Sequence, residues 1–112
     1  MHFIRLDPGA IAAENSAPAP DRVIAGTPVF TSWDIEDAGG LYAGLWQSTP
    51  GKWRVAYDEW EYCHILEGHS ILTEDGGAAQ HLRAGDAIVI RPGFRGSWEV
   101  VETTRKEYVI RT

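Results

Sequence analysis

Glu61 is the residue of this chain best placed for chemistry. It lies in the apolar stretch Trp60–Leu66, whose composition is that of a β-strand. A carboxylate buried in a strand is costly unless it is paired with a cation, hydrogen-bonded or protonated. We expect Lys106, near the end of the chain, to be its cationic partner and Tyr57 to be its hydrogen-bond donor. The three residues predict either an acid–base or ligand-binding site or a structural ion pair.

Strand alternation places further polar side chains beside Glu61, because side chains on one face recur at every second residue. If the register is kept, Tyr57, Glu59 and Cys63 share its face and could surround a small polar ligand or a cation. We favour the simpler interpretation, in which Glu59 lies in an exposed turn and Cys63 is a small buried apolar residue. The histidines have spacings that fit no metal motif and are expected at the surface or in hydrogen bonds: His64, His69 and His81.

Tryptophan is frequent in this chain, with five residues in 112. Large rings fill the core of a small barrel, so at least two of the five must serve packing alone. We expect Trp46 and Trp98 to wall a cavity beside Tyr57 and Glu61. A mostly apolar cavity with a few convergent polar groups is typical of a small-molecule site. The predicted ligand-binding set is therefore Trp46, Tyr57, Glu61, Trp98 and Lys106.

The elements that must position these residues are short strands. Twelve glycines and six prolines separate short apolar runs, with no long helical periodicity, which indicates an all-β sandwich or barrel. Asp75-Gly76-Gly77 predicts a hairpin turn. The candidate strands are Val29–Asp34, Leu41–Gln47, Lys52–Tyr57, Glu61–Glu67, Ser70–Thr73, Ala79–Leu82, Ala87–Ile90, Ser97–Val101 and Glu107–Arg111.

The length predicts a single domain. Residues 1–22 are expected to form a short N-terminal strand at Phe3–Leu6 and an extended arm rich in Ala, Pro and Ser, and residues 23–112 the barrel domain. A net charge of −6 argues against nucleic acid as a partner. No apolar run approaches the length of a membrane helix. The single cysteine cannot form an intrachain disulfide, and the first residues do not resemble a signal peptide, so we expect a cytoplasmic protein.

Two segments of the chain resemble the paired signature motifs of the cupin superfamily. Glu61–Gly68 is a strand that runs into a glycine corner, and Gly85–Gly93 is a Gly-Asp turn, an apolar strand and a Pro-Gly turn. The chain is similar to small single-domain cupins, among them the cupin domain of (S)-ureidoglycine aminohydrolases. The resemblance covers roughly residues 21–111 and implies a double-stranded β-helix, the jelly-roll barrel. It extends to Trp46-Gln-Ser-Thr-Pro-Gly-Lys-Trp53, Gly96-Ser-Trp98 and Arg105-Lys106.

The resemblance also implies where a metal would be held. In metal-binding cupins the first motif supplies two histidines and a glutamate, and the second supplies a further histidine. In this chain Val55 and Tyr57 stand at the first two positions, Gly96 stands at the last, and only Glu61 is retained. One carboxylate alone does not hold a transition metal, which takes three or four ligands. We therefore disfavour a metal at Glu61, although one is possible there, and expect no other cofactor.

Three functions are compatible with these residues. The leading hypothesis is a homodimeric cupin that binds a small polar metabolite at Glu61 without a metal; a carboxylic acid, a ureide or a sugar would fit. The first alternative is an enzyme: either a metal-assisted hydrolase or isomerase resembling the ureidoglycine aminohydrolase cupins, or a metal-free acid–base catalyst in which Glu61 and Tyr57 are catalytic. The second alternative is a dimeric scaffold without a ligand. The dimer follows from the resemblance, since small cupins commonly exchange N-terminal arms, and the arm before Val23 is suited to reaching across.

Overall fold

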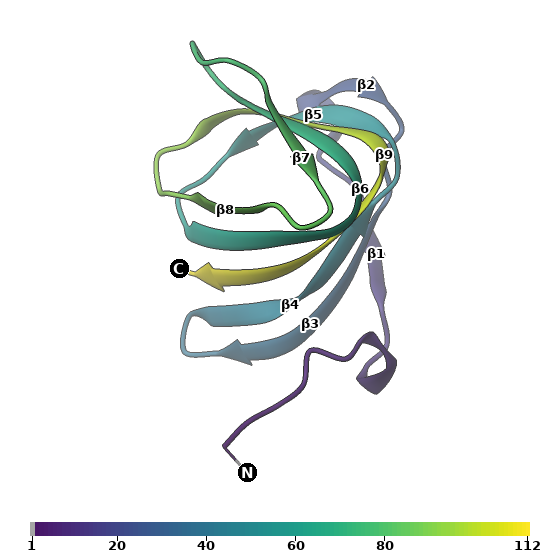
Figure 1. Cartoon of the computed structure of the whole chain (residues 1–112), viewed down its shortest axis with the longest axis vertical. Helices are drawn as coiled ribbons and strands as arrows, with labels where there is room; N and C mark the ends of the chain where they lie inside the picture. The colour runs from purple at the N-terminus through teal and green to yellow at the C-terminus, as the bar shows by residue number, and fades with distance from the viewer. Residues whose placement is uncertain (1) are drawn as a thin grey trace.

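Strands dominate the computed structural model, which describes residues 2–112 (Figure 1). Two 3₁₀ turns, η1 and η2, are the only helical elements among the described residues, so the all-β prediction is confirmed. In chain order the elements are η1 Pro8–Ala10, β1 Glu14–Ser16, η2 Pro20–Arg22, β2 Val23–Gly26, β3 Phe30–Ala38, β4 Leu41–Ser48, β5 Gly51–Ala56, β6 Trp60–Glu74, β7 Gln80–Arg83, β8 Ala87–Ile90 and β9 Arg95–Arg111.

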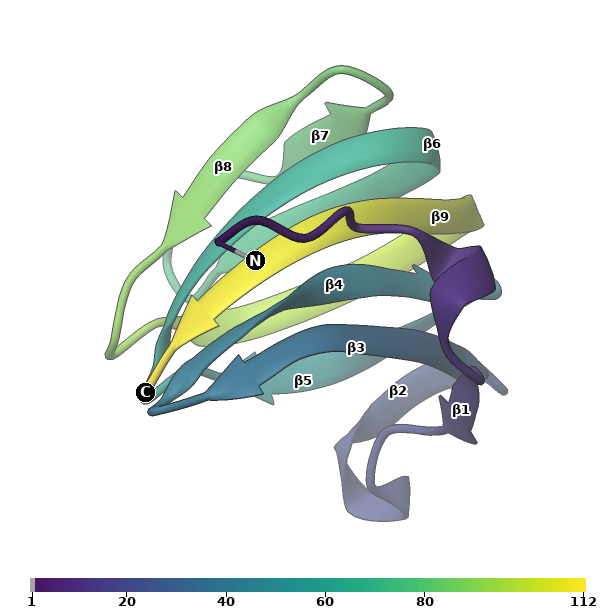
Figure 2. The same ribbon diagram turned by 90° about the horizontal axis from the view of Figure 1, so that it is seen from below.

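The two long strands, β6 and β9, hold the barrel together. Residues 95–100 of β9 pair with β5, residues 104–111 pair with β4, and β9 pairs with β6 along nearly its whole length. β6 in turn carries β7 and β8, and all pairs are antiparallel. Figure 2 shows the result, a strongly curled sheet in which β3, β4, β9 and β6 lie side by side. The inner face of this sheet encloses the core.

Gly68 lets β6 bend without ending. Its φ of +92° lies in the left-handed region that favours glycine, and a Cβ at this position would stand 2.1 Å from the Thr103 carbonyl oxygen of β9. The register shifts between Ile65 and Ser70, as in a bulged strand. The glycine corner expected from the sequence is therefore a bend within one strand. The prediction of two strands at Glu61–Glu67 and Ser70–Thr73 is wrong, because both ranges belong to β6. The prediction of two strands at Ser97–Val101 and Glu107–Arg111 is wrong as well, because both belong to β9.

The core lies on the inner face and is built largely from β5, β6 and β9. Trp53 stands opposite Trp98 in the β5–β9 pair, and Cys63 is fully buried, as the apolar interpretation of this residue predicts. Phe30 and Trp46 pack their rings against Trp53, with centroids 4.9 and 6.2 Å away. The buried cluster comprises Trp53, Cys63, Ile65, Leu72, Leu82, Ile90, Trp98 and Val100.

The N-terminal residues lie on the outside of the barrel. Phe3–Leu6 is not part of a strand, so the strand predicted there is wrong, and Phe3 and Ile4 are exposed. The arm that follows is extended and contributes β1, which pairs with the edge of β3. β2 pairs with β5 and was not predicted from the sequence, because it is short and Ile24 within it faces solvent. No helix in the described part of the chain is long and apolar enough to cross a membrane.

Candidate functional site

A cavity of about 510 Å³ opens inside the barrel between β3, β4, β5, β6 and β9. Seven of the 18 residues that line it are aromatic. A buried acid–base group lies in one part of the wall, and a second carboxylate–phenol pair lies on β3 and β9. The residues that we predicted for ligand binding all line this cavity: Trp46, Tyr57, Glu61, Trp98 and Lys106. Their contact with a ligand stays a prediction.

Strand register explains why these side chains meet. Glu61 of β6 stands opposite Ile110 of β9, and Lys106 stands four residues earlier on the same strand. An even spacing along a strand keeps side chains on one face, so Lys106 projects to the same side as Glu61. Lys106 is also the partner of Trp46 in the β4–β9 pair. The pairing of β4, β6 and β9 therefore delivers a carboxylate, an ammonium group and an indole ring to one place.

Both oxygens of Glu61 are engaged. The Tyr57 hydroxyl donates to Oε1 at 2.6 Å, and Lys106 Nζ donates to Oε2 at 3.1 Å. Glu61 is 3% exposed and Lys106 is 5% exposed, so this ion pair is removed from solvent. A pair buried to this depth is stable only if both charges keep their partners. The structure thus has the Glu61–Lys106 pair and the Tyr57 hydrogen bond that the sequence predicts.

The Lys106 ammonium group lies close to two indole rings and a sulfur atom. Its Nζ atom lies 4.6 Å from the ring centroids of both Trp46 and Trp98 and 3.5 Å from the sulfur of Cys63. Burial alone would lower the pKa of Lys106, but the interactions with Glu61 and Cys63 together outweigh burial, and the pKa is raised. The side chain therefore stays an ammonium ion, stabilised by one full negative charge and two aromatic faces.

The neighbouring acids keep their protons. Burial, followed by the negative charge of Glu61, raises the pKa of Tyr57 well above its usual value. Burial raises the pKa of Cys63 to about 12, although Lys106 opposes the shift. At neutral pH the site thus consists of a phenol, a thiol and an ammonium group around one carboxylate. Neither the phenol nor the thiol is therefore a base at neutral pH.

Trp98 is positioned by a buried polar chain outside the cavity. Its indole N–H donates to Ser70 Oγ at 3.1 Å, and Ser70 Oγ lies 2.7 Å from Thr104 Oγ1. All three residues are buried. Because the polar edge of the indole is satisfied here, the ring itself is left to face Lys106.

A second carboxylate–phenol pair was missed in the sequence. Tyr108 Oη of β9 donates to Asp34 Oδ1 of β3, reaching across Gly44 of β4. A Cβ on Gly44 would stand 3.0 Å from Tyr108 Oη and 1.9 Å from the Trp33 carbonyl oxygen, so only glycine leaves this path open. Partial burial raises the pKa of Asp34, and the nearby charges of Glu14 and Asp37 raise it further. Tyr108 has the same parity as Lys106, which is the signal that could have found it.

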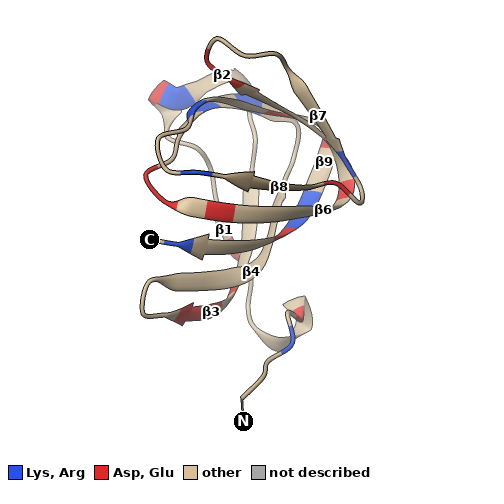
Figure 3. Cartoon of the chain, turned by 60° about the vertical axis from the view of Figure 1, so that its left-hand side comes forward, with Lys and Arg blue, Asp and Glu red and all other residues tan. Residues whose placement is uncertain are grey.

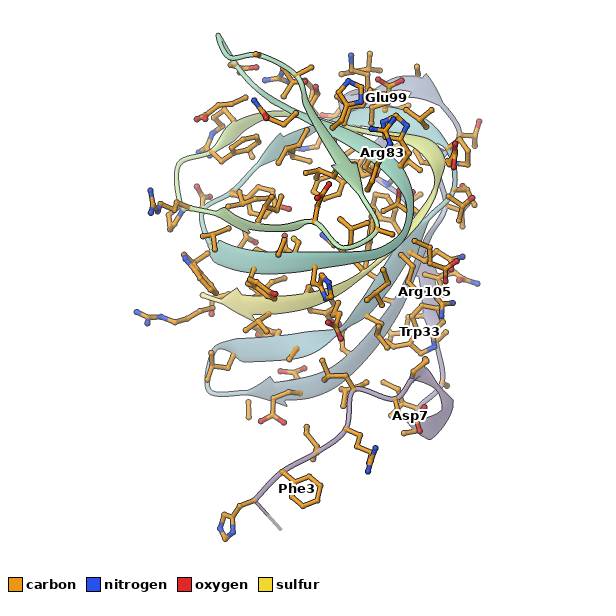
Figure 4. All side chains as sticks on the ribbon, in the orientation of Figure 1. Phe3, Asp7, Trp33, Arg83, Glu99 and Arg105 are labelled. Atoms are coloured by element: carbon orange, nitrogen blue, oxygen red, sulfur yellow. The ribbon has the colours of Figure 1, made fainter. Side chains whose placement is uncertain are left out.

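Other predicted residues lie at the cavity rim or outside the barrel. Glu59 lies in the bend between β5 and β6, as expected, but it is half-buried and lines the cavity, so the expectation that it is exposed is wrong. Arg105 faces outward, with its guanidinium 5.0 Å from the Trp33 ring; Figure 4 labels both on the outer side of the barrel. The histidines are hydrogen-bonded, as predicted: His64 to Glu107, and His69 to His81, each at 2.8 Å.

The residues at the metal positions do not fit a transition metal. Val55 and Gly96 are partners in the β5–β9 pair, and a Cβ on Gly96 would lie 2.1 Å from the Thr73 carbonyl oxygen, which leaves no room for a ligating side chain. The Lys106 ammonium group already occupies one oxygen of Glu61. Residues 2–112 contain no group of three or more His, Cys, Asp or Glu side chains arranged to hold a metal ion. That the purified protein carries no metal stays a prediction.

The distribution of charged residues over the barrel does not favour the binding of a polyanion. In Figure 3 Lys and Arg positions are interspersed with Asp and Glu along the described strands. Arg54, at the cavity rim, is bound in a bidentate pair to Asp75, with contacts of 2.8 and 2.7 Å. Its guanidinium is therefore already engaged within the chain.

The curled antiparallel barrel with a cavity walled by β3, β4, β5, β6 and β9 defines a cupin. A family model described as the EutQ-like cupin domain matches residues 35–108, about two thirds of the chain, so this chain belongs to the EutQ-like cupin family. The resemblance to the cupin superfamily is thereby confirmed. The finer likeness to ureidoglycine aminohydrolases is not among these findings and stays a prediction. No curated protein matches the chain.

Solved structures share this fold. A protein of unknown function of the DUF861 family from Pseudomonas syringae pv. tomato has a TM-score of 0.81 and 24% identity over 89% of this chain and 44% of its own. The EutQ protein of Clostridium difficile has a TM-score of 0.68 and 19% identity over 86% and 79% of the two chains. A putative ethanolamine utilization protein Q from Salmonella typhimurium has a TM-score of 0.66 and 20% identity over 85% and 77%. The chain spans less than half the length of the Pseudomonas protein, and at these identities the likeness shows the fold alone.

Proposed function

We propose that this chain is a cupin that binds a small polar metabolite in its barrel cavity without a metal. One observation carries the proposal: a buried Glu61–Lys106 ion pair faces a cavity of about 510 Å³. A pure packing core would favour apolar side chains here, because burying two charges costs several kcal/mol each before they pair. A cost of this size at the wall of a cavity supports a role in binding.

The polar groups suit a ligand with a hydrogen-bond acceptor. An ammonium group has three N–H donors, and those of Lys106 are directed in part to Glu61 and Cys63. The Tyr57 hydroxyl donates a hydrogen bond to Glu61, and the lone pairs of its oxygen are left for a donor on the ligand. A carboxylic acid, a ureide or a sugar offers such groups on a small frame, and the aromatic walls would cover its apolar face. We further propose, from the sequence, that the protein is a homodimer and lies in the cytoplasm.

The enzymatic alternatives have weaker support. The 2.6 Å hydrogen bond between Tyr57 and Glu61 favours proton transfer, but both oxygens of Glu61 have partners and the pKa of Tyr57 is raised. Glu61 is thus held as an anchor more than as a free base. Metal-assisted hydrolysis or isomerisation lacks a donor set at Val55 and Gly96.

The test is a melting-temperature screen of carboxylic acids, ureides and sugars, combined with mass spectrometry of small molecules released from the natively purified protein. A ligand at a hundred times its Kd stabilises the fold by about 2.7 kcal/mol, which raises the melting temperature by about 10 °C. Tyr57→Phe keeps the ring and removes one hydrogen bond, so affinity should fall about fivefold. Tyr62→Phe is the matched control, because Tyr62 has the opposite parity on β6 and pairs with Val109 away from the cavity.

The proposal fails if no compound of these classes raises the melting temperature and none co-purifies. It also fails if Tyr57→Phe binds the best compound as tightly as Tyr62→Phe does.

A further inference from the structure

Asp34 places a carboxylate at the wall of the cavity, which Arg22 also lines. Tyr108 Oη donates to one oxygen of Asp34, and none of the ion pairs among residues 2–112 includes this carboxylate. Glu14 and Asp37 lie close enough to add their own negative charges. The Asp34 end of the cavity therefore differs from the Glu61 end, where Lys106 neutralises the carboxylate.

The wall around Asp34 is aromatic. Tyr42 and Tyr108 line the cavity with it, and Trp46 continues the wall toward Lys106. The barrel already stabilises one cation against such a wall, since Lys106 Nζ lies 4.6 Å from the Trp46 ring centroid. Aromatic faces beside an acceptor carboxylate are the surroundings that favour an organic cation over a neutral group of the same size.

The backbone at Gly44 is shaped for this arrangement. The missing Cβ is what allows the Tyr108 hydroxyl to reach Asp34. This contact fixes one oxygen of the carboxylate, and the other has no side-chain donor among residues 2–112. The carboxylate is thereby oriented at the cavity wall by a strand two positions away in the sheet. Such support from a neighbouring group is what keeps a binding residue in place before its ligand arrives.

We propose that Asp34 and Tyr108 form a subsite for the ammonium group of a small aliphatic amine, with Tyr42 beside it. The inference rests on the proposed function and narrows its ligand class. The ligand carries a protonated amine that binds at Asp34 and an acceptor, such as a hydroxyl or carboxylate, that binds at Lys106. Asp34 acts as the specificity residue that selects a cation over its neutral analogue.

The test uses two probes of nearly equal shape, 4-amino-1-butanol and 1,4-butanediol, which differ in one ammonium group. Binding to the full chain is followed by isothermal titration and by tryptophan fluorescence. The wild type should bind the amine about tenfold more tightly than the diol. Asp34→Asn should abolish this preference while binding the diol as before. Asp34 is exposed enough for the variant to fold, and circular dichroism verifies this.

Glu36→Gln is the matched control. It removes the same charge from the same strand, but Glu36 borders an outer groove with Leu6 and Ala43. This variant should keep the preference for the amine. An equal loss in Glu36→Gln and Asp34→Asn would overturn the subsite, because long-range charge alone would then explain the preference.

Two further outcomes separate this inference from the proposed function. If carboxylic acids, ureides or sugars bind with sensitivity to Tyr57→Phe but the two probes bind equally, the subsite is wrong and the proposed function stands. If the two probes and all the other compounds leave the wild type unchanged, both are wrong.

Discussion

Replacing Glu61 by Gln tests whether its pair with Lys106 is a true desolvated ion pair. The substitution keeps the side-chain volume and leaves the Lys106 ammonium group 5% exposed with no counter-charge. Removing one partner of a buried pair typically costs about 3–5 kcal/mol. For a chain of this length that loss corresponds to a fall in melting temperature of about 10–20 °C. It is a large part of the roughly 5–15 kcal/mol that stabilises a domain.

The assay is urea unfolding followed by circular dichroism and by tryptophan fluorescence. Lys106→Met should be destabilised to a similar degree, because it strands the Glu61 carboxylate in the barrel. The double variant Glu61→Gln, Lys106→Met has no charge left to bury, so it should recover most of the loss, with a coupling energy of at least about 2 kcal/mol. Glu107→Gln is the control. Its pair with His64 on the outer face is about one-third exposed, and its loss should stay within about 1 kcal/mol.

The reasoning is refuted if Glu61→Gln costs less than about 1 kcal/mol and the two single changes add up to the double. That result would mean that water reaches the pair and that the barrel does not hold it in a low-dielectric site. The cost of burying Glu61 and Lys106 would then no longer support a role for them in binding.

Three more predictions concern the whole protein. The pKa values of Cys63, Tyr57 and Lys106 are all raised in the folded state, so the unfolded chain releases these protons first. The contribution of Cys63 is complete below about pH 9 and is lost toward about pH 12. Cys63→Ala should therefore flatten a plot of urea midpoint against pH, whereas an unchanged slope would contradict the assignment. Elemental analysis should find no stoichiometric transition metal; about one Mn, Fe, Ni or Zn per chain would overturn this. Light scattering at micromolar concentration should give a two-fold dimer, and a mass of 12.4 kDa would argue against it.

The fold class was predictable from the sequence because glycine and proline interrupt every short apolar run. The limits of the strands were not. A glycine at the end of an apolar run resembles a strand terminus, yet Gly68 only bends β6, because its missing Cβ lets Thr103 of β9 come close. β2 escaped notice because an exposed four-residue strand has no periodic pattern to detect.

The site was predictable in part, from strand parity and from the cost of a buried charge. Parity along β6 relates Glu61 and Cys63, and it extends to Tyr57 because the short connection to β5 keeps that side chain at the cavity. A buried carboxylate needs a cation, which pointed to Lys106. The contact of Tyr108 with Asp34 spans three strands, and only the register of β3, β4 and β9 brings the two together. That register depends on tertiary packing, which no local pattern of residues encodes.

The pairing of β9 with three strands also dictates an order of events during folding. Before residues 95–111 are in place, β4 and β5 lack a shared neighbour and β6 lacks its longest partner. Contacts this distant along the chain form late, since loop closure must come before they stabilise anything. During synthesis, therefore, the edges of the earlier strands stay unpaired until β9 leaves the ribosome. In that interval they can pair with other chains. Synthesis that stalls within β9 should thus yield aggregates rather than a smaller barrel.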